Sequence, residues 1–247
     1  MQPEGVLIMV PKGMYKIARK VVVPTHKDLE GRGLMIWFSR GLYDLTLTSV
    51  YCPLCDRDVQ NHKKTERLWQ WAARTRSLIP NRTRHIMGTD ANGRVGSVRH
   101  YTTEDPTRVE DLEDDADYVH IGDKRPDEEN KNGTLMREYL ERTGMEAFNT
   151  WDPEACGHTW TGGKGATSRV DYMLQDVSFR DSTVSIHVAR EFRRTLRGLV
   201  ALEDNDHFPL RLRVRLKPWG GGRPQQKAND YDRQAMTRSC LTWDIKA

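Results

Sequence analysis

Short apolar runs, broken by glycine, proline and charged residues, fill the first fifty positions of the chain. The runs are rich in β-branched residues. In the last of them, leucine, serine and tyrosine alternate with threonine and valine, and this period of two is typical of a β-strand. A proline at position 53 ends that run. The pattern predicts four strands, at Val6–Val10, Arg19–Val23, Leu34–Phe38 and Leu42–Tyr51.

A helical period replaces this pattern after residue 58. Leu68, Trp69, Ala72 and Ala73 recur at spacings of one, three and four among lysines, arginines and glutamates, which predicts an amphipathic helix over Val59–Ser77. A proline three residues beyond the predicted end prevents the helix from continuing.

The rest of the chain combines one more helix with short strands. Leu135, Tyr139 and Leu140 share a helical face, and Gly144 suits the C-cap of that helix. Before it, residues 93–131 form a long polar loop. Further strands are expected at Arg84–Met87, Ala147–Thr150, His158–Trp160, Arg169–Leu174, Thr183–Val188 and Leu210–Leu216. Strands and helices mixed with crossover connections indicate a layered α/β architecture.

The chain of 247 residues suffices for one domain with a substantial core. We expect this domain over residues 1–217, followed by a linker and tail over 218–247, where the sequence turns to PWGGGRP. There is no internal repeat. No apolar run approaches membrane-spanning length, so we expect no contact with a membrane, and we expect a monomer.

Four cysteines bear on location and metal binding: Cys52, Cys55, Cys156 and Cys240. The Cys52-x-x-Cys55 pair has no second pair at matching spacing, which argues against a zinc site. We interpret the cysteines as reduced thiols of an intracellular protein, in the nucleus or the cytoplasm.

The net charge of +4 conceals an uneven distribution. Residues 104–129 contain twelve acidic and three basic residues, a net charge of −9, which leaves +13 for the remainder. A basic body suits a polyanionic partner such as nucleic acid. A solvated surface with one acidic loop explains the same numbers equally well.

Four polar clusters lie at the ends of apolar strands, where ligands and catalytic groups gather in open α/β sheets. They are Tyr51-Cys52-Pro53, Gly88-Thr89-Asp90-Ala91-Asn92, Ser168-Arg169-Val170-Asp171-Tyr172 and Asn205-Asp206-His207-Phe208-Pro209. Each cluster alone also has an ordinary structural interpretation, such as a half-buried aromatic, a turn, an ion pair within a strand or a loop end.

The order of the four clusters is more specific than any one of them. Together they resemble the endonuclease/exonuclease/phosphatase superfamily, which includes deoxyribonuclease I-like enzymes, abasic-site endonucleases and the endonuclease domains of non-LTR retrotransposons. Asn132-Gly133-x-Leu135, Asn149-Thr150 and Thr159-Trp160 fit the same resemblance, which spans about residues 5 to 217. It implies a four-layered α/β sandwich, in which two packed β-sheets are flanked by helices.

The resemblance also implies phosphodiester hydrolysis of DNA with Mg²⁺ or Mn²⁺ as the cofactor. Asp90 would orient or deprotonate the attacking water, and it would bind the metal together with Asp206. Asn92 would hold a phosphate oxygen. His207 would contact the scissile phosphate, and Asp171 would fix the tautomer of its imidazole.

Three further residues are assigned by the same resemblance. Tyr51 would donate to the phosphate or assist the leaving group, and a tyrosine at this position is typical of the abasic-endonuclease and retrotransposon branches. Trp160 and Arg169 would contact the substrate, although a core aromatic is an equally good interpretation of Trp160.

One part of the family pattern is not visible. The superfamily opens with a strand ending in Asn, a helix, and a strand ending in Glu, and these two residues help to bind the metal. Glu4 precedes the first predicted strand and lacks the strand context to substitute. We therefore expect a domain without its first strand-helix-strand unit, with exposed apolar edges and weaker metal binding.

Three hypotheses follow. The first is a metal-dependent endonuclease that nicks DNA and derives from a retroelement. The second is a catalytically inactive, truncated remnant that still binds nucleic acid through its basic body. The third is a superfamily phosphatase, which Tyr51 in place of a histidine disfavours.

Overall fold

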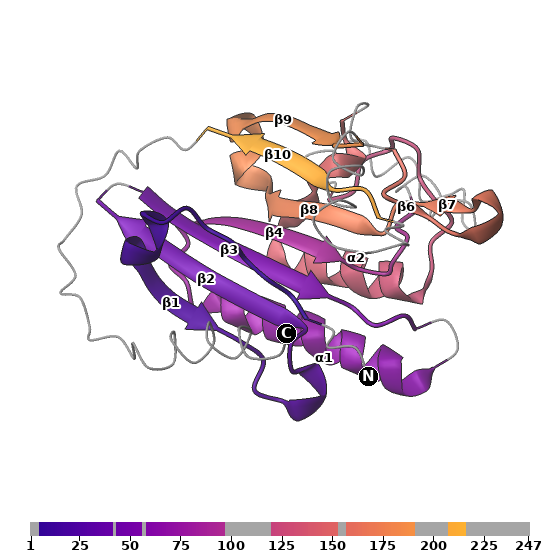
Figure 1. The fold of residues 1–247 in the computed structure, drawn as a ribbon, viewed down its shortest axis with the longest axis horizontal. Helices are drawn as coiled ribbons and strands as arrows, with labels where there is room; N and C mark the ends of the chain where they lie inside the picture. Colours follow the sequence, from indigo (N-terminus) through magenta and orange to yellow (C-terminus); the bar gives the residue numbers. More distant parts are fainter. Residues whose placement is uncertain are drawn as a thin grey trace, which may run out of the picture.

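The computed structural model describes residues 5–41, 43–55, 58–96, 120–152, 157–190 and 207–215. Its centre is a six-stranded sheet in the order β1-β2-β3-β4-β8-β5 (Figure 1). Strands β3 and β4 run parallel, and the other neighbours in the sheet are antiparallel. The six strands are β1 (Ala18–Val22), β2 (Gly33–Arg40), β3 (Tyr43–Tyr51), β4 (Arg84–Asp90), β8 (Asp171–Asp176) and β5 (Met145–Ala147).

Two helices, α1 (Val59–Ser77) and α2 (Lys131–Thr143), cover one face of this sheet (Figure 1). Side chains at alternate positions of the strands point toward them, because successive strand residues face opposite sides. Trp69 of α1 and Tyr139 of α2 meet with ring centroids 4.8 Å apart. The buried core therefore lies between the helices and the sheet. It includes Val50, Leu68, Trp69, Met87, Met136, Tyr139, Leu140, Tyr172 and Leu174.

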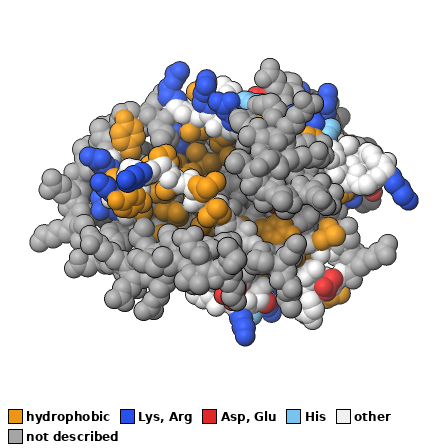
Figure 2. Space-filling model, in the orientation of Figure 1, with side chains coloured by type: hydrophobic (Ala, Val, Ile, Leu, Met, Phe, Trp, Pro, Cys, Tyr) orange, Lys and Arg blue, Asp and Glu red, His pale blue; other side chains and the backbone are white. Residues whose placement is uncertain are grey.

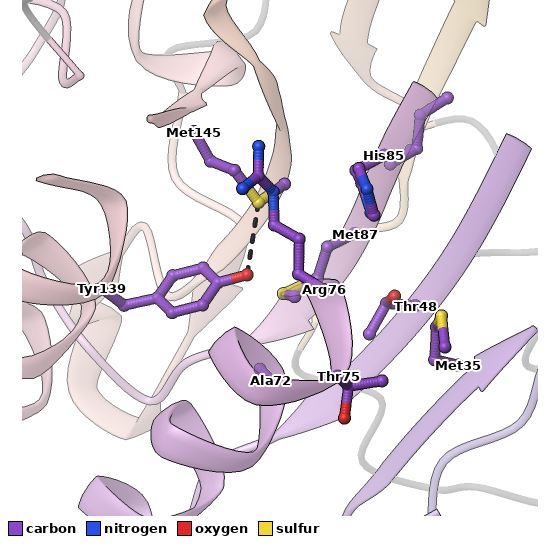
Figure 3. A pocket seen from close by; sticks show the side chains of 10 residues that line it. Met35, Thr48, Ala72, Thr75, Arg76, His85, Met87, Tyr139 and Met145 are labelled. Carbon is purple, nitrogen blue, oxygen red and sulfur yellow. Dashed lines mark hydrogen bonds between the residues drawn. The ribbon is translucent and has the colours of Figure 1, made fainter. Parts of the chain in front are cut away.

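A polar cluster lies within this otherwise apolar layer. Arg76 of α1 pairs with Asp176 of β8, and the imidazole Nδ1 of His85 lies 2.7 Å from the hydroxyl of Thr46. Figure 3 shows Arg76 and His85 beside a small cavity of about 10 Å³ between the helices and the sheet. Burial and the charge of Arg76 lower the pKa of His85 to about 3, so this imidazole is neutral in the folded protein.

A smaller layer packs over the opposite face of the sheet. Strands β9 (Thr183–Val188) and β10 (Leu210–Val214) form an antiparallel pair, and β6 (Trp160–Thr161) pairs with β7 (Thr167–Ser168). Arg84 connects the layers, since its guanidinium donates to the carbonyl of Arg215 and the hydroxyl of Ser182, both at 2.8 Å. The predicted α/β class is confirmed, as a six-stranded sheet with two smaller sheets and few helices, although the described α-helices cover only one face of the larger sheet rather than both sides of a four-layered sandwich (Figure 1).

Most predicted elements are present within a residue or two. The helix predicted over Val59–Ser77 has those bounds, and Gly144 caps α2 with φ of 66°, in the left-handed region. Two predictions are wrong. Val6–Val10 forms no strand, since its backbone pairs with no described strand and Val6 only donates to the carbonyl of Gly31. Phe148–Thr150 forms a 3₁₀ helix after β5.

Two other expectations concern the ends and the surroundings of the domain. Residues 218–247, the expected linker and tail, lie outside the described residues. Within the described part of the chain, neither α-helix combines the length and the apolar character that crossing a bilayer requires.

Candidate active site

Strand register brings three of the predicted site residues into one row. Tyr51 ends β3 opposite Asp90, which ends the parallel strand β4. Asp90 in turn lies opposite Asp171, the first residue of the antiparallel strand β8. Cross-strand partners point to the same face of a sheet, with neighbouring strands about 5 Å apart. The three side chains therefore share the face opposite to the helices.

His207 joins this row from the second layer. Its Nδ1 lies 2.9 Å from the Oδ2 of Asp171. The side chains of His207 and Asp171 are 34% and 21% exposed, so the pair is accessible without being fully solvated. Because a carboxylate only accepts hydrogen bonds, Nδ1 of a neutral imidazole carries the proton, and the lone pair is on Nε2.

Thr159 holds the Asp171 and His207 segments in register. Its buried hydroxyl accepts the N–H groups of Val170 and Asp171, at 3.1 and 3.0 Å. Its carbonyl accepts the N–H of Phe208, directly after His207, at 2.6 Å. One residue thus fixes the backbone on both sides of the carboxylate–imidazole contact.

Asn149 supports the same strand from the other side. Its side-chain amide donates to the carbonyl of Asp171 at 3.1 Å and accepts from the N–H of Met173 at 3.2 Å. The sequence indicates Asn149 and Thr159 only as parts of motifs that resemble the family, and it does not predict that they support the backbone around Asp171. The signal was a buried polar residue in the segments next to an expected strand.

Asn92 connects the two loops that leave β3 and β4. Its φ of 43° lies in the left-handed region, which asparagine tolerates better than most residues. Its N–H donates to Oδ1 of Asp90 at 3.0 Å, and its Nδ2 donates to the carbonyl of Cys52 at 2.9 Å. A side-chain amide has two N–H groups, so the second can still serve a phosphate oxygen.

Asn132, in the first turn of α2, reinforces this arrangement. Its buried Nδ2 donates to the carbonyls of Pro53 and Ala91, at 2.9 and 3.0 Å. The residues after Tyr51 and after Asp90 are therefore anchored to the same helix. This explains why an Asn-Gly pair opening a helix accompanies the two site motifs.

The two expected substrate-binding residues have different environments. Trp160 is partly exposed in β6 and forms an isolated bridge with His207, which places it beside the candidate site. Arg169 is only 2% exposed, and its guanidinium donates to the carbonyls of Lys124 and Arg125. Arg169 thus anchors the 124–125 segment, and its contact with substrate stays a prediction.

An open cleft of about 460 Å³ contains the row of site residues. Tyr51, Asp90, Asp171 and His207 line one part of it, and Val6 and Leu7 line another. Figure 2 shows hydrophobic side chains lining hollows on this face of the molecule.

Asp90, Asp171 and His207 form the group of described residues that could hold a metal ion, with ligand atoms all within 4.8 Å of one another. Two carboxylates with water completing the shell suit a hard divalent cation. The residues present therefore fit the expected cofactor class. Asp206, the other expected metal ligand, lies outside the described residues.

The cysteines beside the site do not form a metal centre with other described residues. Cys52 and Cys55 are buried free thiols and belong to no cluster of potential ligands. Burial, with smaller contributions from Asp90 and Cys55, raises the pKa of Cys52 well above its usual value. Its thiol is therefore protonated at neutral pH, as expected for an unreactive core cysteine.

Comparison with solved structures returns DNA-processing enzymes. The 3′-5′ exonuclease NExo from Neisseria meningitidis superposes with a TM-score of 0.52 at 15% identity, covering 80% of this chain and 72% of that one. The 3′ phosphatase NExo from Neisseria, bound to a product DNA hairpin, gives 0.51 at 15% identity, covering 80% and 71%. An AP endonuclease from Archaeoglobus fulgidus gives 0.51 at 16% identity, covering 80% and 71%.

The chain shares the fold of these solved structures. No family model matches the sequence, and a search of curated proteins finds no match. At identities of 15 and 16%, the likeness establishes the fold alone, and the activity has to be argued from the site.

Proposed function

We propose that the protein is a metal-dependent phosphodiesterase that nicks DNA. The observation that carries this proposal is the convergence of Tyr51, Asp90, Asp171 and His207 in one open cleft. Phosphodiester hydrolysis needs an activated water, compensation for the phosphate charge and a stabilised leaving group. The cleft contains a group suited to each of these tasks.

The Asp171–His207 pair stabilises the phosphate as charge develops. Asp171 keeps the imidazole in one orientation, and a protonated His207 can donate from Nε2 to a phosphate oxygen. Asp90 orients the attacking water and accepts its proton. Tyr51, in register with Asp90, is placed to donate its hydroxyl to the phosphate or to the leaving oxygen.

A divalent cation, Mg²⁺ or Mn²⁺, would supply Lewis-acid compensation for the phosphate charge. Asp90 would hold it, together with Asp206 by the family pattern. Asp171 and His207 contribute ligand atoms within reach of the same point. Because Asp171 is also the hydrogen-bond acceptor of His207, metal binding and imidazole orientation are coupled through one carboxylate.

We infer DNA as the substrate from the basic body of the chain and from the DNA-processing enzymes that share its fold. Tyr51 in place of a histidine favours the abasic-endonuclease and retrotransposon branches, and hence a retroelement origin. We further propose that it acts as a monomer. We also propose that the enzyme works inside the cell, in the nucleus or the cytoplasm, where free thiols such as those of Cys52 and Cys55 persist.

A second candidate function is removal of 3′ phosphates from DNA ends. It is favoured by the described activity of one structurally similar protein, the 3′ phosphatase NExo. The chemistry at phosphorus is the same for both candidates, so the cleft alone supports either. They differ in whether the enzyme acts within a strand or at its end.

A substrate panel separates these candidates. Supercoiled plasmid, a duplex with a 3′ phosphate, and an abasic duplex are each incubated with the full chain and Mg²⁺ or Mn²⁺, with and without EDTA. Asp90→Asn is the test variant, and Asp181→Asn, an exposed carboxylate outside the cleft, is the matched control. We expect the wild type and Asp181→Asn to nick the plasmid only when metal is present, and we expect Asp90→Asn not to nick it. Phosphate release without nicking would support the second candidate, and inertness toward all three substrates would refute both.

A further inference from the structure

Strand β10 and the residue that follows it carry a row of three arginines at alternate positions. Arg211, Arg213 and Arg215 are exposed, and they alternate with the partly buried Leu210, Leu212 and Val214. The apolar set, together with part of Arg211, lines a hollow against the six-stranded sheet. The alternation therefore gives this segment an inward apolar face and an outward basic face.

Arg211 and Arg213 lie two residues apart in β10, and Arg215 directly follows the end of the strand. Residues two apart on one face of a strand are separated by about 6.6 Å. Arg211 lies opposite His187 and Arg213 opposite Ser185 of β9, so the cross-strand neighbours are polar and carry no negative charge. Among the described residues, no ion pair involves any of the three guanidinium groups.

The β9–β10 pair is held firmly enough to present this row. It forms a continuous antiparallel ladder, with a register shift only between Arg213 and Val214. Arg84 ties the far end of the ladder to β4 through the carbonyl of Arg215. Guanidinium groups on a supported strand lose less conformational entropy on binding than groups on a loop.

We propose that Arg211, Arg213 and Arg215 form a second nucleic-acid contact, which binds successive phosphates of a strand outside the active site. The choice of nucleic acid as the partner rests on the proposed function. A row of guanidinium groups fits a polymer with regularly repeated phosphates, and backbone contacts of this kind position a strand without reading its sequence. An anionic membrane is the less suitable partner, because the cross-strand neighbours of the row are polar rather than apolar.

The row is also close to the proposed chemistry along the chain. Arg211 follows His207 by four residues, which an extended strand spans in about 13 Å. A nucleic acid that occupies the cleft can therefore reach the row with a few additional nucleotides. The row would set how the substrate enters and how tightly it is retained, while Asp90 and His207 determine the rate of hydrolysis.

The test is the salt dependence of DNA binding by the full chain, measured by fluorescence anisotropy in EDTA so that no cleavage occurs. The triple variant R211Q/R213Q/R215Q removes the row. The matched control K12Q/K16Q/K20Q removes three exposed lysines in or near β1, an edge strand of the six-stranded sheet, whereas β10 belongs to a separate sheet. R211K/R213K/R215K keeps the charge, and circular dichroism confirms that each variant is folded.

Each phosphate contact contributes about 0.9 to the slope of log affinity against log salt for duplex DNA. We expect the arginine-to-glutamine variant to lower this slope by about 2.7, and the lysine control to lower it by less than about 1. Between 50 and 200 mM salt, wild type should lose about 40-fold more affinity than the variant. The arginine-to-lysine variant should retain most of the wild-type slope.

Equal slopes for the glutamine variant and the lysine control would overturn the proposal, because net charge alone would then explain binding. Loss of binding to phosphatidylserine vesicles without loss of DNA binding would also overturn it, in favour of a membrane surface. If the triple variant does not fold, R213Q alone should lower the slope by about 0.9. If the wild type does not nick DNA but the arginine-to-glutamine variant still lowers the salt slope as expected, the proposed function is refuted and this inference stands.

Discussion

Removing the hydroxyl of Thr159 should disrupt the site without touching any of its reactive groups. In Thr159→Val, the buried N–H groups of Val170 and Asp171 lose their common acceptor while the side-chain volume is kept. An unsatisfied buried donor costs about 1–3 kcal/mol, so two of them cost roughly 2–5 kcal/mol of the free energy of unfolding. For a domain of this size, that lowers Tm by about 5–15 °C.

The same substitution should reduce activity through geometry. Asp171 is the first residue of β8, and its N–H makes one of the lost hydrogen bonds. Its carboxylate orients His207, whose Nδ1 lies 2.9 Å from Oδ2. Displacing this carboxylate by about 1 Å is expected to lower the nicking rate by up to about 100-fold. The assays are urea denaturation and nicking of supercoiled plasmid, with protein concentration and metal held constant.

Thr159→Ser is the matched control, since it keeps the hydroxyl and removes only a methyl group. We expect it to retain most of the wild-type stability and activity, because the two backbone donors stay satisfied. Equal stability and equal nicking rates for the valine and serine variants would refute the reasoning. They would show that the Thr159 hydroxyl does not position Asp171.

Two further predictions test the packing of the sheet and the helices. His85 has a pKa of about 3 in the folded protein against its ordinary value of 6.5, so between pH 6.5 and about 3 the unfolded chain binds a proton that the folded protein does not bind. The His85 contribution should lower the free energy of unfolding by at most about 1.4 kcal/mol per pH unit as the pH drops from about 6.5 toward 3. Urea denaturation at pH 7.5 and 5 should therefore show a smaller loss for His85→Gln than for wild type; an equal loss would contradict the burial of a neutral imidazole. Gly133→Ala would place a Cβ 1.8 Å from the carbonyl oxygen of Arg94. We therefore expect this substitution to lower the free energy of unfolding by about 1–3 kcal/mol, measured by thermal denaturation. The control Gly163→Ala, which has open space around it, should be tolerated in that assay.

Local sequence patterns were sufficient to predict the elements that combine strong periodicity with clear ends. In α1, the apolar residues at Leu68, Trp69 and Ala72 share a face, and the acceptor side chain of Asp58 caps the first turn. In α2, Gly144 supplies the left-handed residue that ends the helix. Both ends are determined within a few residues of chain, so no tertiary information was needed.

Predictions failed where the structure depends on a partner distant in the sequence. Val6–Val10 has the composition of a strand, but a strand also requires a neighbour to complete its hydrogen bonds, and sequence periodicity cannot supply one. Phe148–Thr150 directly follows Ala147, the last residue of β5, and was expected to belong to a strand over Ala147–Thr150. The chain instead turns there, which brings the Asn149 amide against the backbone of Asp171 and Met173.

The candidate site was accessible from sequence through the order of its motifs. That order placed Tyr51, Asp90 and Asp171 at strand ends, and the strand register then brought them together. The same reasoning could not reveal that Arg169 is buried against main-chain carbonyls. A guanidinium next to a catalytic motif looks the same in sequence whether it contacts substrate or supports a loop.

The central claim, that the His207–Asp171–Asp90 cleft hydrolyses phosphodiesters, is tested most directly by the nicking rate of His207→Ala. The full chain is incubated with supercoiled plasmid and Mn²⁺, beside an EDTA control and His26→Ala, which alters a histidine with a 61% exposed side chain outside the cleft. We predict that His207→Ala lowers the rate by about 10²- to 10⁴-fold, while His26→Ala matches wild type. Nicking by His207→Ala at the wild-type rate, or nicking that persists in EDTA, would contradict the account.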